Sequence, residues 1–125
     1  MRHKVAIITG AGRGIGAATS KIFAQNNFSV VLVSRTLSQL QAVNNEIKES
    51  IPLSKTLVFQ ADISQKDEVE KLFKTTFDTF NDFHILINNA AVGFITPFAQ
   101  ITPEEWDSIM AINLRGAFLC SQQAF

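Results

Sequence analysis

The stretch that decides the fold is Thr-Gly-Ala-Gly-Arg-Gly-Ile-Gly, residues 9–16. It follows an apolar run over 5–8 that predicts a buried strand. It precedes a segment in which Ile15, Ala18, Ile22 and Phe23 fall at helical spacing. Glycines let the backbone turn tightly and let a ligand approach where a Cβ would collide. The free N–H groups and positive dipole end of the following helix favour an anion, so the stretch predicts a phosphate-binding turn.

The rest of the chain repeats this alternation of strand and helix. Apolar runs over 30–33, 56–59 and 85–87 predict three more strands. Helical patterns cover about 14–26, 37–50, 65–80 and from 103 toward the end. Alternating strands and helices indicate right-handed βαβ units, hence an α/β fold with a Rossmann-type, doubly wound parallel sheet. We expect strand order 3-2-1-4 in a single domain over 1–125, with the fourth strand as a long apolar sheet edge.

Three helix starts carry capping patterns. Thr36 followed by Gln39 three residues later predicts a capping box, and Ser64 is expected to cap the third helix. The strongest pattern is Thr102-Pro103-Glu104-Glu105, with Thr at the N-cap, Pro at the first helical position and Glu at the third. The last helical pattern ends at Phe125 without a Gly, Asn or Pro stop, so we expect it to be cut rather than finished.

Composition excludes several classes of function. The formal net charge of the 125 residues is zero, which argues against nucleic acid or a membrane surface as the main partner. A single cysteine, Cys120, is typical of a reducing compartment, so we expect a cytoplasmic protein in which Cys120 packs as a small apolar residue. No spacing of His, Cys or acidic residues predicts a metal site. His3 and His84 precede strands, at the end of the sheet away from the expected crevice.

The glycine spacing, together with later landmarks, resembles the compact branch of the short-chain dehydrogenase/reductase family. Gly10, Gly14 and Gly16 follow a Thr at that family's spacing, Asp62-Ile63 follows the third strand, and Asn88-Asn89-Ala90-Ala91 is similar to its Asn-Asn-Ala-Gly. The resemblance implies that Asp62 receives the adenine amino group and that Asn88 ties the central strands together. It also implies that Asn113 distorts its helix and holds a water of the proton relay. The cofactor-binding candidates are Gly10, Gly12, Arg13, Gly14, Ile15, Gly16, Ser34, Arg35, Asp62, Ile63, Asn89 and Ala90, and the catalytic candidate is Asn113.

Simpler interpretations stay open for several of these residues. Asp62 could only be an acid at a helix start beside Ser64, and Arg35 a solvated residue at the start of the second helix. A mid-helix Asn such as Asn113 is more often a surface residue. Gly12 and its neighbours could form a glycine-rich turn that binds nothing.

The identity of the dinucleotide can be argued from charge. NAD enzymes usually carry an acid about 20 residues past the glycines, where it bonds the ribose 2′-hydroxyl. Here that position holds Ser34, followed by Arg35, and Arg13 lies in the glycine loop. Two guanidinium groups near a ribose suit a 2′-phosphate. The sequence therefore predicts NADP(H) rather than NAD(H).

The resemblance also implies residues that this sequence lacks. In the family a Ser-Tyr-Lys set transfers the proton while hydride moves between nicotinamide and a small-molecule carbonyl or alcohol. The 125 residues contain no Tyr. We therefore expect the amino-terminal, NADP(H)-binding half of a 3-oxoacyl-reductase-like enzyme, inactive by itself and self-associating as a homo-oligomer. The alternatives are a short NADP-binding module without chemistry and a relic that no longer binds.

Overall fold

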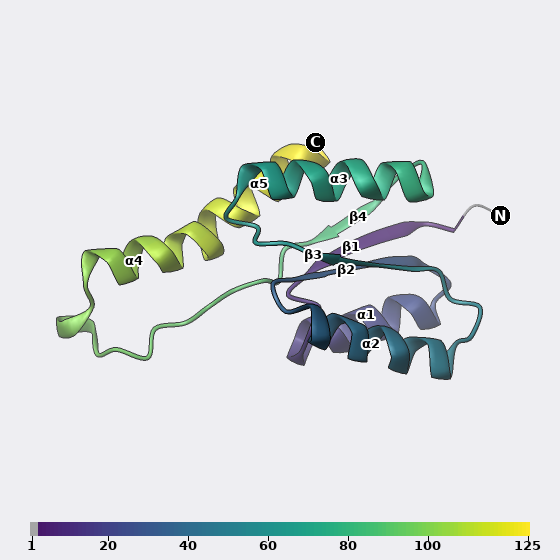
Figure 1. The fold of residues 1–125 in the computed structure, drawn as a ribbon, viewed down its shortest axis with the longest axis horizontal. Helices are drawn as coiled ribbons and strands as arrows, with labels where there is room; N and C mark the ends of the chain where they lie inside the picture. Colours follow the sequence, from purple (N-terminus) through teal and green to yellow (C-terminus); the bar gives the residue numbers. More distant parts are fainter. Residues whose placement is uncertain (1–2) are drawn as a thin grey trace.

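The apolar runs form a parallel sheet with helices on both of its faces (Figure 1). The protein is described by a computed structural model over residues 3–125. The strands are β1 (Val5–Thr9), β2 (Ser29–Ser34), β3 (Thr56–Gln60) and β4 (Ile85–Ile87). The helices are α1 (Gly14–Gln25), α2 (Leu37–Ser50), α3 (Lys66–Phe80), the 3-10 turn η1 (Phe98–Gln100), α4 (Pro103–Met110), the π-helical segment η2 (Ala111–Gly116) and α5 (Ala117–Ala124).

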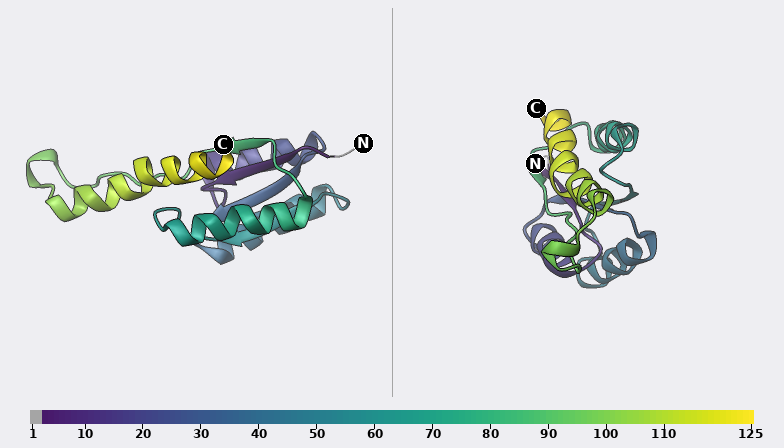
Figure 2. Two further views of the ribbon diagram at one scale, coloured as in Figure 1. Left: turned by 90° about the horizontal axis from the view of Figure 1, so that it is seen from above. Right: turned by 90° about the vertical axis from the view of Figure 1, so that its left-hand side faces the viewer.

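The strand order confirms the predicted topology. The strands pair in parallel in the order β3-β2-β1-β4, and the register places Ile7 of β1 opposite Val31 of β2 and Leu86 of β4. The helices α1 and α2 cover one face, while α3 and α5 cover the other (Figures 1 and 2). The carboxyl ends of β1 and β4 therefore meet where the chain order reverses, which is the position of ligand crevices in such sheets.

Alternate residues of the central strands supply two cores. Val31 and Val33 of β2 join Leu72 and Phe73 of α3 on one face, and Val30 and Leu32 face α1 and α2. This alternation follows from the period of two along a strand, and it explains why a strand covered on both faces is apolar throughout.

The buried thiol of Cys120 belongs to the core between the sheet and α5. Burial without compensating charge raises the pKa of this thiol to about 11. The thiol therefore stays protonated at neutral pH, and its role is packing, as the sequence predicted.

The segment from Pro103 to Ala124 is one long helical rod whose α4 end extends beyond the sheet (Figure 2). Its start confirms the prediction, because the Thr102 hydroxyl accepts a hydrogen bond of 3.1 Å from the Glu105 N–H. Its middle is wound as a π-helix over Ala111–Gly116. Such segments are rare and occur most often at functional sites.

Two other predicted caps are wrong. Thr36 is the N-cap residue of α2, but its side chain makes no capping hydrogen bond. In a capping box the Gln39 side chain would accept a hydrogen bond from the Thr36 N–H. Here the Ser34 hydroxyl accepts it instead, at 3.2 Å. The N-cap of α3 is Gln65 rather than Ser64. The Ser64 hydroxyl instead donates to the Asp62 carboxylate at 2.7 Å.

Two further expectations differ from the structure. Helix α1 buries its small residues, such as Gly16, Ala17 and Ser20, and leaves Ile15 78% and Ile22 58% exposed. Small residues let the helix axis approach the sheet closely, so residue size decides the buried face here. The edge strand β4 has only three residues, all half-buried, and is not the long apolar edge that the sequence suggested.

Candidate functional site

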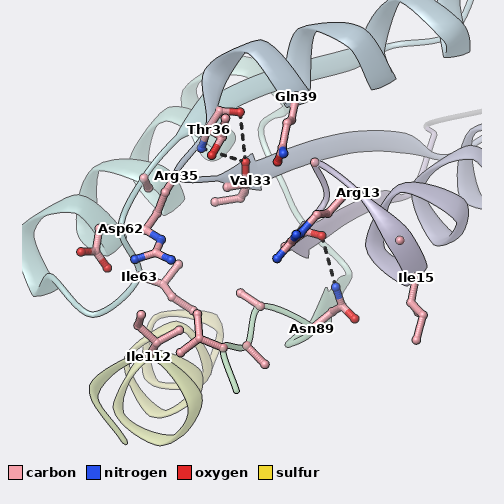
Figure 3. Close-up of a pocket in the computed structure, with 18 residues that line it drawn as sticks. Arg13, Ile15, Val33, Arg35, Thr36, Gln39, Asp62, Ile63, Asn89 and Ile112 are labelled. Atoms are coloured by element: carbon pink, nitrogen blue, oxygen red, sulfur yellow. Dashed lines mark hydrogen bonds between the residues drawn. The ribbon is translucent and has the colours of Figure 1, made fainter. Parts of the chain in front are cut away.

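A cleft of about 480 Å³ opens at the carboxyl ends of the strands (Figure 3). The structure brings around it every predicted cofactor-binding residue except Gly16. The glycine loop, the end of β2, the turn after β3 and the segment after β4 each contribute one wall. Its lining also includes residues that were not predicted: Val33, Thr36, Gln39, Ala61, Ala91, Val92 and Ile112.

The first wall is held in place by Thr9, a buried residue at the end of β1. Its hydroxyl oxygen accepts hydrogen bonds from the backbone N–H groups of Asn89 and Ala90, both at 3.0 Å, and donates to the Ile87 carbonyl at 3.3 Å. The Asn89 amide donates back to the carbonyl oxygens of Thr9 at 3.1 Å and Gly10 at 3.3 Å. Thr9 therefore joins β1 to the segment after β4.

Asn88 does not make this connection, contrary to the role that the resemblance implied. Its side chain donates to the Ser121 hydroxyl in α5 at 3.0 Å. The central strands are tied by Asn89 and Thr9 instead. The sequence did not predict this role of Thr9, because a Thr at the end of a strand is common. Only the hydrogen bonds between its hydroxyl and the segment after β4 reveal that Thr9 joins the two segments.

Three glycines in the loop have different structural roles. Gly10 has φ of 65°, and a Cβ there would lie 2.9 Å from the Ala90 Cα. A Cβ on Gly16 would lie 2.1 Å from the Gly10 carbonyl oxygen, so Gly16 lets α1 pack against the loop rather than lining the cleft. Gly14 has φ of 55° and faces open space. The loop is thus closed on its inner side and accessible at the first turn of α1.

Two positively charged side chains face the cleft, one from the glycine loop and one from the second wall, at the end of β2. Arg13 is the N-cap residue of α1, and Arg35 follows β2 directly. Figure 3 shows both side chains reaching toward the opening from different sides. Within residues 3–125 neither guanidinium group forms an ion pair. Both charges are therefore available to an anion.

The third wall is the turn after β3. One oxygen of the Asp62 carboxylate accepts from the N–H of Ser64 at 3.0 Å and from its hydroxyl at 2.7 Å, while Glu68 accepts the Asp62 N–H. Asp62 thus orders the turn beside Ser64, as the simpler interpretation has it, and it also lines the cleft. Ile63 beside it packs against Gly116, where a Cβ would lie 2.7 Å from the Ile63 side chain.

The fourth wall is fixed by Asn113 in the π-helical segment. Its amide oxygen accepts from the Val92 N–H at 2.8 Å, and its amide nitrogen donates to the Val92 carbonyl at 2.7 Å. Asn113 is therefore no free surface residue, and it does not line the cleft itself. It clamps the segment after β4, and neighbouring Ile112 closes the cleft on that side (Figure 3).

The two histidines lie at the opposite end of the sheet. The Val5 N–H donates to Nδ1 of His84 at 3.1 Å, and His3 bonds the Asn27 carbonyl at 2.8 Å. Both are structural contacts away from the cleft.

Among the residues that the structure describes, no group of three or more His, Cys, Asp or Glu side chains could hold a metal ion. No helix in residues 3–125 has the length and apolar character needed to cross a bilayer.

Proteins with similar sequences and structures with a similar fold are known. A short-chain dehydrogenase from Picea abies is 37% identical over 97% of this chain and 47% of its own length. A 3-oxoacyl-[acyl-carrier-protein] reductase from Synechocystis is 35% identical over 95% of this chain and 48% of its own. The crystal structure of a metagenomic short-chain oxidoreductase with NADP superposes with a TM-score of 0.89 at 33% identity, over 98% of this chain and 54% of that one.

A structure of 3-ketoacyl-(acyl-carrier-protein) reductase from Brucella melitensis with NADH superposes with a TM-score of 0.88 at 35% identity, over 96% of this chain and 48% of that one. The chain spans about half the length of the curated relatives it matches. The family model described as short chain dehydrogenase matches residues 4–125. With the parallel sheet and the cleft beside its glycine loop, this match shows that the chain belongs to the short-chain dehydrogenase/reductase family.

Proposed function

We propose that this chain is the NADP(H)-binding portion of a short-chain oxidoreductase. The observation that carries the proposal is that Arg13 and Arg35 face one cleft beside Ser34, and that neither guanidinium group forms an ion pair within residues 3–125. An acid at the end of β2 would repel a 2′-phosphate, and Ser34 carries no charge. Guanidinium groups form charge-assisted, often bidentate hydrogen bonds with phosphate.

The remaining walls suit the other parts of the same dinucleotide. The N-cap side chain of α1 makes no capping hydrogen bond, so the N–H groups of the first turn, around Gly14 and Ile15, are open to a pyrophosphate. Asp62 and Ile63 would hold the adenine, and Asn89 with Ala90 would lie along the ribose of the nicotinamide. When bound, the nicotinamide supplies hydride transfer to or from a carbonyl carbon.

We propose that Asn113 is a positioning residue, which keeps the nicotinamide side of the cleft in shape. Its amide oxygen accepts from the Val92 N–H, and one of its two N–H donors bonds the Val92 carbonyl, so the side chain holds the segment after β4 against the π-helical segment. A proton donor is also needed, and the 125 residues contain no Tyr. We therefore propose binding without turnover, with a small carbonyl or alcohol as the substrate class of the oxidoreductase, acting in the cytoplasm.

Binding and turnover can be measured on one preparation of the 125-residue chain. NADPH fluorescence should saturate on titration, because the cleft walls are all present. NADPH absorbance should then stay constant after addition of a generic carbonyl compound, because the proton donor is absent. Turnover above the rate of a chain-free control would contradict the second half of the proposal, and unsaturable fluorescence would contradict the first.

We also propose that the chain self-associates through the α4–α5 rod. Leu114 and Phe118 are 67% and 59% exposed on it, and a second copy would cover them. Light scattering should give a mass above that of a monomer at high concentration, and Phe118→Ser should lower it. Leu53→Ser, at an exposed residue outside the rod, is the matched control and should leave the mass unchanged. A monomeric wild-type chain would contradict the proposal.

A further inference from the structure

The side chain of Gln39 lies in the cleft instead of capping its helix. Gln39 is the third residue of α2, where a capping box would direct it back to the Thr36 N–H. Ser34 accepts that N–H at 3.2 Å instead. Gln39 is left against the glycine loop, where a Cβ on Gly12 would lie 3.0 Å from both its Cβ and its Oε1.

The position of Gln39 places an uncharged amide beside two cations. Its side chain points into the same opening as those of Arg13 and Arg35 (Figure 3). It is exposed and makes no hydrogen bond to any of the residues 3–125. A carboxamide carries two N–H donors, and here neither donor is used within the described chain.

The nearby hydroxyl of Ser34 is already engaged. It accepts the Thr36 N–H at 3.2 Å and lies 3.3 Å from the Thr36 carbonyl, to which it donates. Its only proton therefore has a partner in the turn after β2. Of these two side chains, the Gln39 amide rather than the Ser34 hydroxyl has donors left for a ligand.

We propose that Gln39 determines dinucleotide specificity by donating a hydrogen bond from its carboxamide to the 2′-phosphate held between Arg13 and Arg35. The inference rests on the proposed function, because it assumes that NADP(H) occupies the cleft. The proposed role of Gln39 depends on its side chain being uncharged. A carboxylate of the same shape would repel the phosphate and accept a hydrogen bond from a free ribose 2′-hydroxyl, which favours NAD(H).

The variant Gln39→Glu tests this with a change of one functional group. Its control is Gln41→Glu, which adds the same charge to the same helix at an exposed residue that does not line the cleft. We expect Gln39→Glu to weaken NADPH binding about tenfold or more and to leave the Kd for NADH unchanged or lower. Gln39→Met, which keeps the length and removes the donors, should weaken NADPH binding severalfold without strengthening NADH.

The possible outcomes distinguish a failure of the inference about Gln39 from a failure of the proposed NADP(H)-binding function. If the wild-type chain prefers NADPH and Gln39→Glu keeps the wild-type ratio of the two Kd values within twofold, the inference is wrong and the proposed function stands. If Gln41→Glu shifts the ratio as much as Gln39→Glu, the effect is general charge and the inference is again wrong. If the wild-type chain binds neither dinucleotide or prefers NADH, both fail. Circular dichroism and the thermal midpoint check that the variants fold.

Discussion

Replacing Gly16 with alanine is expected to weaken dinucleotide binding about 100-fold and to destabilise the fold. The added Cβ would lie 2.1 Å from the Gly10 carbonyl oxygen and 2.6 Å from the Asn89 amide nitrogen. Both neighbours are held by the hydrogen bonds around Thr9, so neither can move away freely. Overpacking of this kind lowers the free energy of unfolding by about 1–3 kcal/mol, and α1 must shift from the loop.

Gly93→Ala is the matched control for this variant. It makes the same chemical change in the segment after β4, at a glycine whose added Cβ would meet nothing within 4 Å. Urea unfolding and NADPH titration should give wild-type values for Gly93→Ala and losses in both for Gly16→Ala. Wild-type affinity in Gly16→Ala would mean that the close packing of α1 on the loop does not shape the binding site.

Removing the two guanidinium groups has the second-largest expected effect. Arg13→Ala and Arg35→Ala should each weaken NADPH binding at least tenfold, and the double variant about 100-fold, because a hydrogen bond to a charged group contributes about 1.5–3 kcal/mol. Affinity for NADH should change little, because NADH lacks the 2′-phosphate. Calorimetric titration of both dinucleotides measures the two effects separately.

The control for charge is Arg115→Ala, which removes an exposed cation outside the cleft. It should leave both affinities unchanged. The NADPH affinity of the wild-type chain should also fall with added salt, and that of the double variant should fall less. Equal losses for NADPH and NADH in the arginine variants would place these side chains at the pyrophosphate or outside the site, and the argument for a 2′-phosphate would be wrong.

Much of the fold could be predicted because the strands are buried on both faces. In β2, for example, residues 30–33 form a continuous apolar run between two serines, and the alternation of such runs with helices leaves few topologies open. Helix α2 was predicted with its observed bounds, Leu37–Ser50, and α1, α3 and the four strands differ from their predicted ranges by at most one residue at either end. The cleft followed from the topology, since loops after parallel strands meet at one edge of the sheet.

What could not be predicted depends on competition between neighbouring groups. Thr36 and Gln39 match a capping box, but Ser34 is close enough to take the N–H on which the box depends. The buried face of helix α1 could not be predicted either. The spacing of its large apolar residues indicated that their face would be buried, but the structure packs the face with the small residues against the sheet. The clamp between Asn113 and Val92 joins residues far apart in sequence, so the residues alone gave no sign of it.

The most direct test of the central claim is the ratio of the Kd values of NADPH and NADH for the wild-type 125-residue chain, measured by calorimetry at one ionic strength. Arg13 and Arg35 form no ion pair within residues 3–125, and their charges predict that NADPH binds at least about tenfold more tightly, a difference of about 1.4 kcal/mol. Equal affinities, or tighter binding of NADH, would contradict the proposal that this cleft is a binding site for NADP(H).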